Sequence, residues 1–207
     1  MFEFFLKAYE NATLTQIVLE ITVFVFGILS VWCAKRENIL VYPTGLIATI
    51  ITTYLLFQAD YLGDMTINIY FSIVSIYGWA NWAKKSNEKE DITISRTNSK
   101  QKIIGFALFF ITIFVVFSIY IYFDYEIKFD SYIDIFASGI FFVAMWFMAL
   151  KKIENWTLWI LGDLIVVPLY AYRGLGMLAL QYLIFTILAI SAYLKWKKIL
   201  NNRLHIL

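Results

Sequence analysis

Three carboxylate residues, Glu20, Asp134 and Asp163, stand inside long apolar stretches of this 207-residue chain. An ionisable side chain at bilayer depth costs roughly 2.5–3.5 kcal/mol on insertion scales, so each needs a function or a partner. No lysine or arginine lies within these stretches, and Arg173, the nearest to Asp163, is ten residues further along. Acids without a basic partner indicate a cavity that accepts cations or exchanges protons. For Glu20 and Asp134 we favour the simpler interpretation that they reach water at the outer interface.

Aromatic and polar side chains accompany these acids at helical spacing. Trp156, Trp159 and Asp163 are three and four residues apart, so they share one face of a helix. An earlier apolar segment carries a stripe with the same spacing, which comprises Asp64, Asn68, Ser72, Ser75, Trp79 and Trp82. For Trp82, Trp196 and the serines we favour roles in the aromatic belt and in helix packing.

Gln181 and Tyr182 in the last apolar segment, and Tyr42 at the start of the second, complete the set of candidate binding residues. Aromatic faces attract organic cations, more strongly when the pair is desolvated. The amides of Asn68 and Gln181 can both donate and accept hydrogen bonds. These residue types predict a site for a flat cationic ligand with hydrogen-bonding groups.

The composition of the chain requires a membrane. Apolar and aromatic residues make up 61% of it, charged residues only 15%, and the mean hydropathy is +0.73. A soluble domain has about 25% charged residues, so a separate soluble catalytic domain is excluded. One cysteine, Cys33, excludes a disulfide framework and a cysteine-based metal site.

Seven apolar segments are long enough to cross about 30 Å of hydrocarbon. They run approximately over Leu14–Ala34, Ile39–Phe57, Asp64–Ala83, Ile103–Phe123, Ser131–Leu150, Trp156–Tyr172 and Leu175–Leu194. The predicted fold is therefore an all-α integral membrane protein with seven transmembrane helices. The polar stretch 84–102 is expected to be a solvated linker.

The distribution of basic residues predicts the orientation. Fourteen lysines and arginines flank one end of the segments and three flank the other. By the positive-inside rule, the N-terminus lies outside and the C-terminus in the cytoplasm of a multi-pass protein of the inner membrane.

The chain also repeats itself. A shift of 117 residues lays the first three segments over the last three without a gap, with Gly45 on Gly162 and Trp79 on Trp196. Because one segment separates the halves, both cross the bilayer in the same sense, as parallel repeats do in some transporters. We expect one transporter domain over residues 1–207, with repeat one at about 14–83, a linker helix at about 103–123 and repeat two at about 131–198.

Two runs of residues resemble the PnuC family of vitamin transporters. They are NIYFSIVSIYGWANW, from Asn68 to Trp82, and NWTLWILGDLIVVPLY, from Asn155 to Tyr170. The resemblance extends from about Glu20 to Lys198, and the three-plus-one-plus-three layout of that family agrees with the repeat.

The resemblance implies uptake of nicotinamide riboside by facilitated diffusion, followed by trapping through a cytoplasmic kinase for NAD biosynthesis. It also implies a homotrimer similar in architecture to SWEET carriers. Carried onto this sequence, it places Asn155, Trp156, Trp159 and Asp163 at or beside the substrate. Asn68, Tyr70, Trp79 and Tyr182 would complete the lining.

Other functions stay open at this stage. Two alternatives are a carrier of the same family for thiamine or another vitamin, and a carrier coupled to protons through Glu20, Asp134 or Asp163. A small membrane enzyme is a remote alternative, because no metal-ligand spacing, nucleophile motif or phosphate loop occurs. We therefore expect a protein that is not an enzyme, with no cofactor, no metal and no nucleic-acid partner.

Overall fold

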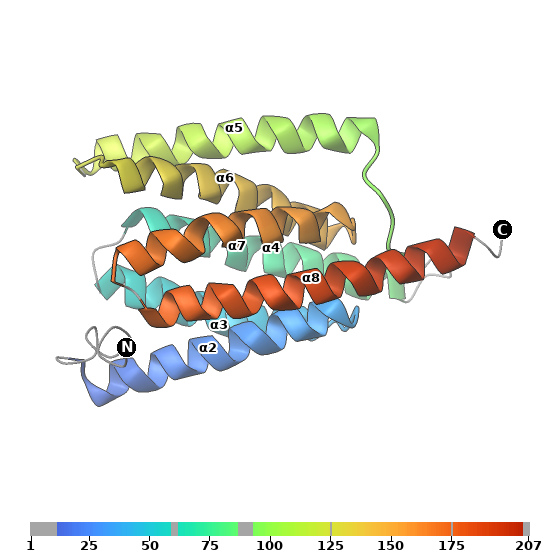
Figure 1. Ribbon diagram of the computed structural model, residues 1–207, viewed down its shortest axis with the longest axis horizontal. Helices are drawn as coiled ribbons and strands as arrows, with labels where there is room; N and C mark the ends of the chain where they lie inside the picture. The colour runs from blue at the N-terminus through green and yellow to red at the C-terminus, as the bar shows by residue number, and fades with distance from the viewer. Residues whose placement is uncertain (1–11, 59–61, 87–92, 125, 175, 205–207) are drawn as a thin grey trace.

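The computed structural model describes residues 12–58, 62–86, 93–124, 126–174 and 176–204. Over these residues the chain forms seven helices, in agreement with the seven predicted segments (Figure 1). They are α2 (Leu14–Lys35), α3 (Val41–Gln58), α4 (Leu62–Ser86), α5 (Ser99–Tyr122), α6 (Phe129–Ala149), α7 (Glu154–Tyr172) and α8 (Gly176–Leu204).

Local sequence signals set the starts of two helices. Thr13 precedes α2 and accepts a hydrogen bond from the backbone N–H of Gln16, whose side chain accepts one from the backbone of Thr13 in return. Asn98 and Gln101 form the same reciprocal pair before α5. Such capping boxes satisfy N–H groups that the first turn of a helix leaves without intrahelical partners.

The helices form two triplets and a connecting helix. In the first triplet α3 packs against both α2 and α4, and in the second α7 packs against both α6 and α8. The triplets meet where α2 packs against α8 and α4 against α6, while α5 packs mainly on α6. This arrangement confirms the predicted three-plus-one-plus-three fold. The exact boundaries of the two repeats stay a prediction.

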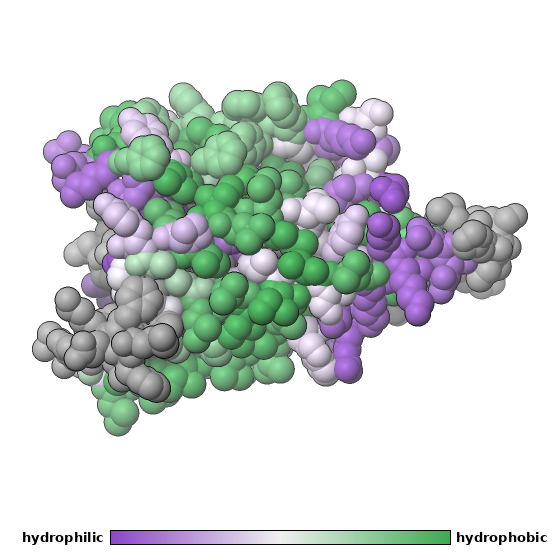
Figure 2. All heavy atoms as spheres, viewed as in Figure 1, coloured by the Kyte–Doolittle hydropathy of each residue, from purple (hydrophilic) through white to green (hydrophobic). Residues whose placement is uncertain are grey.

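The outer surface suits a bilayer. Figure 2 shows apolar side chains over the middle of the visible face and hydrophilic ones gathered toward both ends. Five helices, α2, α3, α5, α6 and α8, are long and apolar enough to cross a membrane by length and composition alone. The remaining two, α4 and α7, carry the polar stripes described above. On α5, Phe106 and Phe114 are 68% and 72% exposed, as expected of side chains that face lipid.

The linker before α5 was predicted to be solvated over residues 84–102, and two of its described residues depart from that prediction, while the side chains of 84–92 lie outside the described part of the chain. Among its described residues, Ile94 is 2% exposed and Thr97 is 8% exposed. The backbone of Ser95 pairs with Lys151 and Ile153 in the turn between α6 and α7, and the backbone N–H of Thr97 donates to the Glu154 carboxylate. Backbone pairing to another loop thus anchors a segment whose side chains alone favour water.

Candidate functional site

A cavity of about 680 Å³ lies between the two triplets. This volume is in the range of small-molecule binding sites. Its walls come from α2, α3 and α4 on one side and from α6, α7 and α8 on the other, and its lining extends to Glu126 and Lys128 in the connection between α5 and α6.

The second triplet contributes an acid and two indoles. Trp156, Trp159 and Asp163 all line the cavity, as their spacing on one helical face predicts. Asp163 is 1% exposed, and neither of its carboxylate oxygens has a hydrogen-bond partner among the described residues. The indole N–H groups of both tryptophans are likewise buried without an acceptor there. A buried carboxylate beside aromatic faces is suited to bind an organic cation.

Further aromatic rings enclose Trp159. The ring centroids of Phe141 and Phe71 lie 5.3 Å and 6.2 Å from that of Trp159. Tyr182 lies 6.0 Å from Phe141 and 5.2 Å from Tyr170. These five side chains line the cavity, so a flat ligand there would meet aromatic surface from several directions.

Tyr42 faces the cavity from the first triplet. It is 1% exposed, and its hydroxyl has no partner in the described part of the chain. Its ring packs edge-on against Trp82, with centroids 5.2 Å apart. A Cβ at Gly78 would lie only 2.4 Å from the Tyr42 ring, so glycine is required there for the two helices to approach.

Seven of the ten predicted binding residues line the cavity, namely Tyr42, Asn68, Trp156, Trp159, Asp163, Gln181 and Tyr182. Tyr70, Trp79 and Asn155 do not. Tyr70 stacks on Phe142 between α4 and α6 and donates to the carbonyl of Phe142. Trp79 is 39% exposed near the end of α4. Asn155 is fully buried and donates to the carbonyl of Lys152, where it braces the start of α7.

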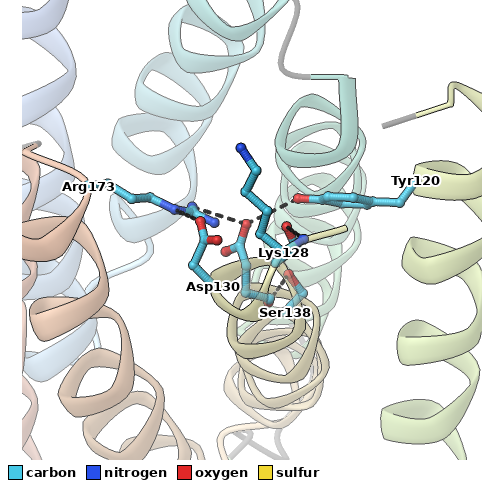
Figure 3. A network of polar contacts seen from close by, with 7 residues as sticks. Tyr120, Lys128, Asp130, Ser138 and Arg173 are labelled. Carbon is cyan, nitrogen blue, oxygen red and sulfur yellow. Dashed lines mark hydrogen bonds and ion pairs between the residues drawn. The ribbon is translucent and has the colours of Figure 1, made fainter. Parts of the chain in front are cut away.

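The structure corrects the interpretation of Asp134. This residue is 5% exposed on the cavity lining instead of extending into outer water, and its carboxylate lies 3.4 Å from the Arg173 guanidinium. Arg173 also pairs with Asp130 at 2.8 Å, and the Tyr120 hydroxyl donates to Asp134 at 3.3 Å (Figure 3). Sequence analysis missed this network because Arg173 and Asp134 are 39 residues apart. The available signal was the antiparallel packing of α6 and α7, which brings the end of one beside the start of the other.

No cluster of three or more His, Cys, Asp or Glu side chains that could hold a metal occurs among the described residues. At the position of Asp163 the cavity offers this acid together with the indoles, tyrosines and amides, and near its Lys128 end it also carries Glu126, Asp130, Asp134 and Arg173. Such a set binds a ligand by charge, ring contact and hydrogen bonding.

Residues 17–198 match a protein family described as nicotinamide mononucleotide transporter. The chain belongs to this family. It is 24% identical over 193 residues to the nicotinamide riboside transporter PnuC of Escherichia coli K12, which covers 82% of this chain and 81% of the relative. The PnuC of Shigella flexneri matches equally. The crystal structure of the vitamin B3 transporter PnuC superposes with a TM-score of 0.73, at 21% identity, over 97% of this chain and 89% of that one.

These matches confirm the resemblance to PnuC transporters that the two sequence runs carried. The protein is a multi-pass transporter of the inner membrane and not an enzyme. The solved structure supports the fold.

Proposed function

We propose that this protein carries nicotinamide riboside into the cell by facilitated diffusion. The observation that carries the proposal is the buried carboxylate of Asp163, which lines the cavity beside Trp156 and Trp159 and has no cationic partner among the described residues. The pyridinium ring of nicotinamide riboside is flat and bears a fixed positive charge. The ring therefore supplies a positive charge that can pair with the Asp163 carboxylate and a flat face that can stack on the indole rings. The names of the relatives in Escherichia coli and Shigella flexneri support the same substrate.

Transport requires alternating access, and the contacts between the triplets support a form closed at one end. Lys151, in the turn between α6 and α7, pairs with Glu37, in the turn between α2 and α3, at 3.6 Å. At the same end, Asn81 and Trp82 both donate to the carbonyl of Ala149. The cavity lining, by contrast, extends to Lys128 at the opposite end. We propose that release of the substrate requires the contacts between the triplets to separate.

The charges favour the orientation with the closed end in the cytoplasm. Basic residues crowd that end, including Lys35, Arg36, Lys151 and Lys152, as the positive-inside rule requires of a cytoplasmic face. The homotrimer implied by the family resemblance stays a prediction, and the mass of the detergent-solubilised particle would test it.

Uptake by proteoliposomes tests the function. Wild-type protein is expected to admit labelled nicotinamide riboside down its gradient, and the Asp163→Asn variant to admit it at least about tenfold more slowly, because the cation loses its charged partner. Asp124→Asn is the matched control, since Asp124 is exposed at the end of α5 outside the cavity lining. Equal uptake by the Asp163→Asn variant would contradict the proposed site.

The same vesicles separate the alternatives. Unlabelled thiamine should compete more weakly than unlabelled nicotinamide riboside, and a protonophore should leave uptake unchanged. Stronger competition by thiamine would assign the carrier to that vitamin. Collapse of uptake with the protonophore would replace facilitated diffusion by proton coupling.

A further inference from the structure

The two walls of the cavity differ in chemistry. The second triplet supplies Asp163 and both indoles, whereas the first supplies no acid to the lining among the side chains that the structure describes. Instead, the first triplet lines the cavity with four small hydroxyl residues, the hydroxyl wall: Ser30, Thr49, Thr52 and Ser75. The second triplet also lines the cavity with Ser131 and Ser138, but Ser138 donates to the backbone carbonyl of Asp134 and Ser131 accepts from the backbone N–H of Lys128, near the charged network of Figure 3.

The difference does not follow from the fold. Positions 117 residues after the hydroxyl wall hold Phe147, Val166, Leu169 and Ala192, which are all apolar. Conversely, the positions 117 residues before Asp163 and Trp156 hold Leu46 and Ile39, whereas the position 117 residues before Trp159 holds Tyr42, which also lines the cavity. The two repeats thus share one aromatic position and differ at the others, with hydroxyl groups in the first repeat and the acid in the second.

The hydroxyl protons of Ser30, Thr49 and Thr52 in this wall already have acceptors. Ser30 donates to the carbonyl of Val41 and Thr52 to that of Ala48, both at 2.8 Å. Thr49 lies 2.8 Å from the hydroxyl of Ser72, which in turn donates to a backbone carbonyl on α4. A hydroxyl group that already donates its one hydrogen bond can still accept hydrogen bonds through its oxygen lone pairs. The wall therefore presents acceptors to a ligand that brings several O–H donors.

Two further features point to a ligand at this wall. The Tyr42 hydroxyl, on the same helix as Thr49 and Thr52, is buried on the cavity lining without a partner in the described residues. Gly45, between them in the chain, lines the cavity too, and a Cβ there would lie 3.0 Å from the Ser30 hydroxyl oxygen. The glycine keeps the space beside that hydroxyl open.

We propose that the hydroxyl wall is a sugar subsite. The substrate binds with its cationic ring against Asp163 and Trp159 of the second triplet and its ribose hydroxyls against Ser30, Thr49 and Thr52 of the first. This inference rests on the proposed function and adds the orientation of the substrate. It selects a ribosylated cation over an equally charged cation without a sugar, because a site built to hydrogen-bond hydroxyl groups discriminates against analogues that lack them.

Calorimetric titration of the purified protein with two probes tests the subsite. Nicotinamide riboside carries the ring and the sugar, whereas 1-methylnicotinamide carries the same cationic ring with a methyl group in place of the sugar. The variants are Thr52→Val and Ser30→Ala, each of which removes one hydroxyl at nearly constant shape. Thr53→Val is the matched control, since Thr53 donates to a carbonyl four residues back as Thr52 does but does not line the cavity.

The wild type is expected to bind nicotinamide riboside more tightly than 1-methylnicotinamide. Thr52→Val and Ser30→Ala should each weaken the binding of nicotinamide riboside by about 3- to 10-fold, the effect expected for the loss of one hydrogen bond. The affinity for 1-methylnicotinamide should stay unchanged in both variants. Thr53→Val should change neither. Equal effects on both probes, or none, would overturn the sugar subsite while the proposed function stands. A wild type that binds neither probe would overturn the proposed function itself.

Discussion

Lys151 and Glu37 join the two triplets through an ion pair of 3.6 Å between loops that are far apart in the sequence. The Lys151 ammonium also lies 4.4 Å from the centre of the Trp82 ring, so this one cation makes both an ion pair and a cation–π contact. Both Lys151 and Glu37 adopt positive φ angles, 51° and 57°, which turn each loop sharply between its two helices. The pair closes the same end of the cavity as the contacts of α4 with the carbonyl of Ala149.

Loss of this pair should loosen the closed end. Cys33, the one cysteine of the chain, is 7% exposed near the end of α2 and reports on opening there. Glu37→Gln is expected to accelerate its reaction with a maleimide by about 2- to 5-fold, in keeping with a partly exposed ion pair. Glu126→Gln breaks the exposed Glu126–Lys128 pair of 3.0 Å at the other end and should not change the rate. An unchanged rate in Glu37→Gln would show that this pair does not hold the loops together.

The network of Figure 3 should stabilise the fold through Arg173. Arg173→Gln leaves the buried Asp134 carboxylate without its cation and should lower stability by about 3–5 kcal/mol, the range for breaking one side of a buried pair. Thermal unfolding in detergent measures the loss. The double variant with Asp134→Asn should recover part of it, because the uncompensated charge is gone. Lys128→Gln is the control, because it breaks only the exposed ion pair with Glu126, and it should not change the midpoint temperature of unfolding.

Substitutions of Trp159 and Trp79 provide a matched comparison that tests the location of the binding site. Both lie on helical stripes that sequence analysis proposed as binding faces, but Trp159 lines the cavity and Trp79 is 39% exposed outside it. Trp159→Ala is expected to slow uptake of labelled nicotinamide riboside by about 10-fold, the scale of a desolvated cation–π contact. Trp79→Ala should retain wild-type uptake. The reverse result would move the site to the outer face of α4.

Gly162 permits the aromatic enclosure of the site. A Cβ at this position would lie 2.3 Å from the Phe141 ring, which packs against Trp159. Gly162→Ala should therefore lower stability by about 1–3 kcal/mol through overpacking and also weaken substrate binding. Adding Phe141→Leu makes room for the methyl group and should restore the unfolding temperature without restoring affinity. Full stability in Gly162→Ala alone would contradict this tight packing.

Much of the fold could be predicted because it depends on local properties of the chain. The length of an apolar run decides whether a segment spans a bilayer, and the helical period decides which side chains share a face. Trp156, Trp159 and Asp163 were correctly grouped for this reason. The shift of 117 residues likewise predicted two matching triplets before any contact between helices was known.

The periodic stripe on α4 shows the limit of this reasoning. Asn68 and Ser75 reach the cavity, whereas Trp79 is 39% exposed, although Trp82, three residues further on in the same stripe, is buried against Tyr42. A helical period groups residues on one face but does not decide which of them meet another helix. Tyr70 was assigned by family resemblance alone, and its ring packs between α4 and α6 instead.

The sequence by itself therefore determined the membrane environment, the seven helices, their pairing into repeats and the acid and indoles that share one face of α7. Only the tertiary structure decided that Asp134 has Arg173 as its partner, that Asp163 has no partner in the described chain, and that a hydroxyl wall stands across the cavity. The physical reason is that charge pairing and burial depend on distances between helices. These distances arise from packing over the whole chain, and no local pattern of residues encodes them.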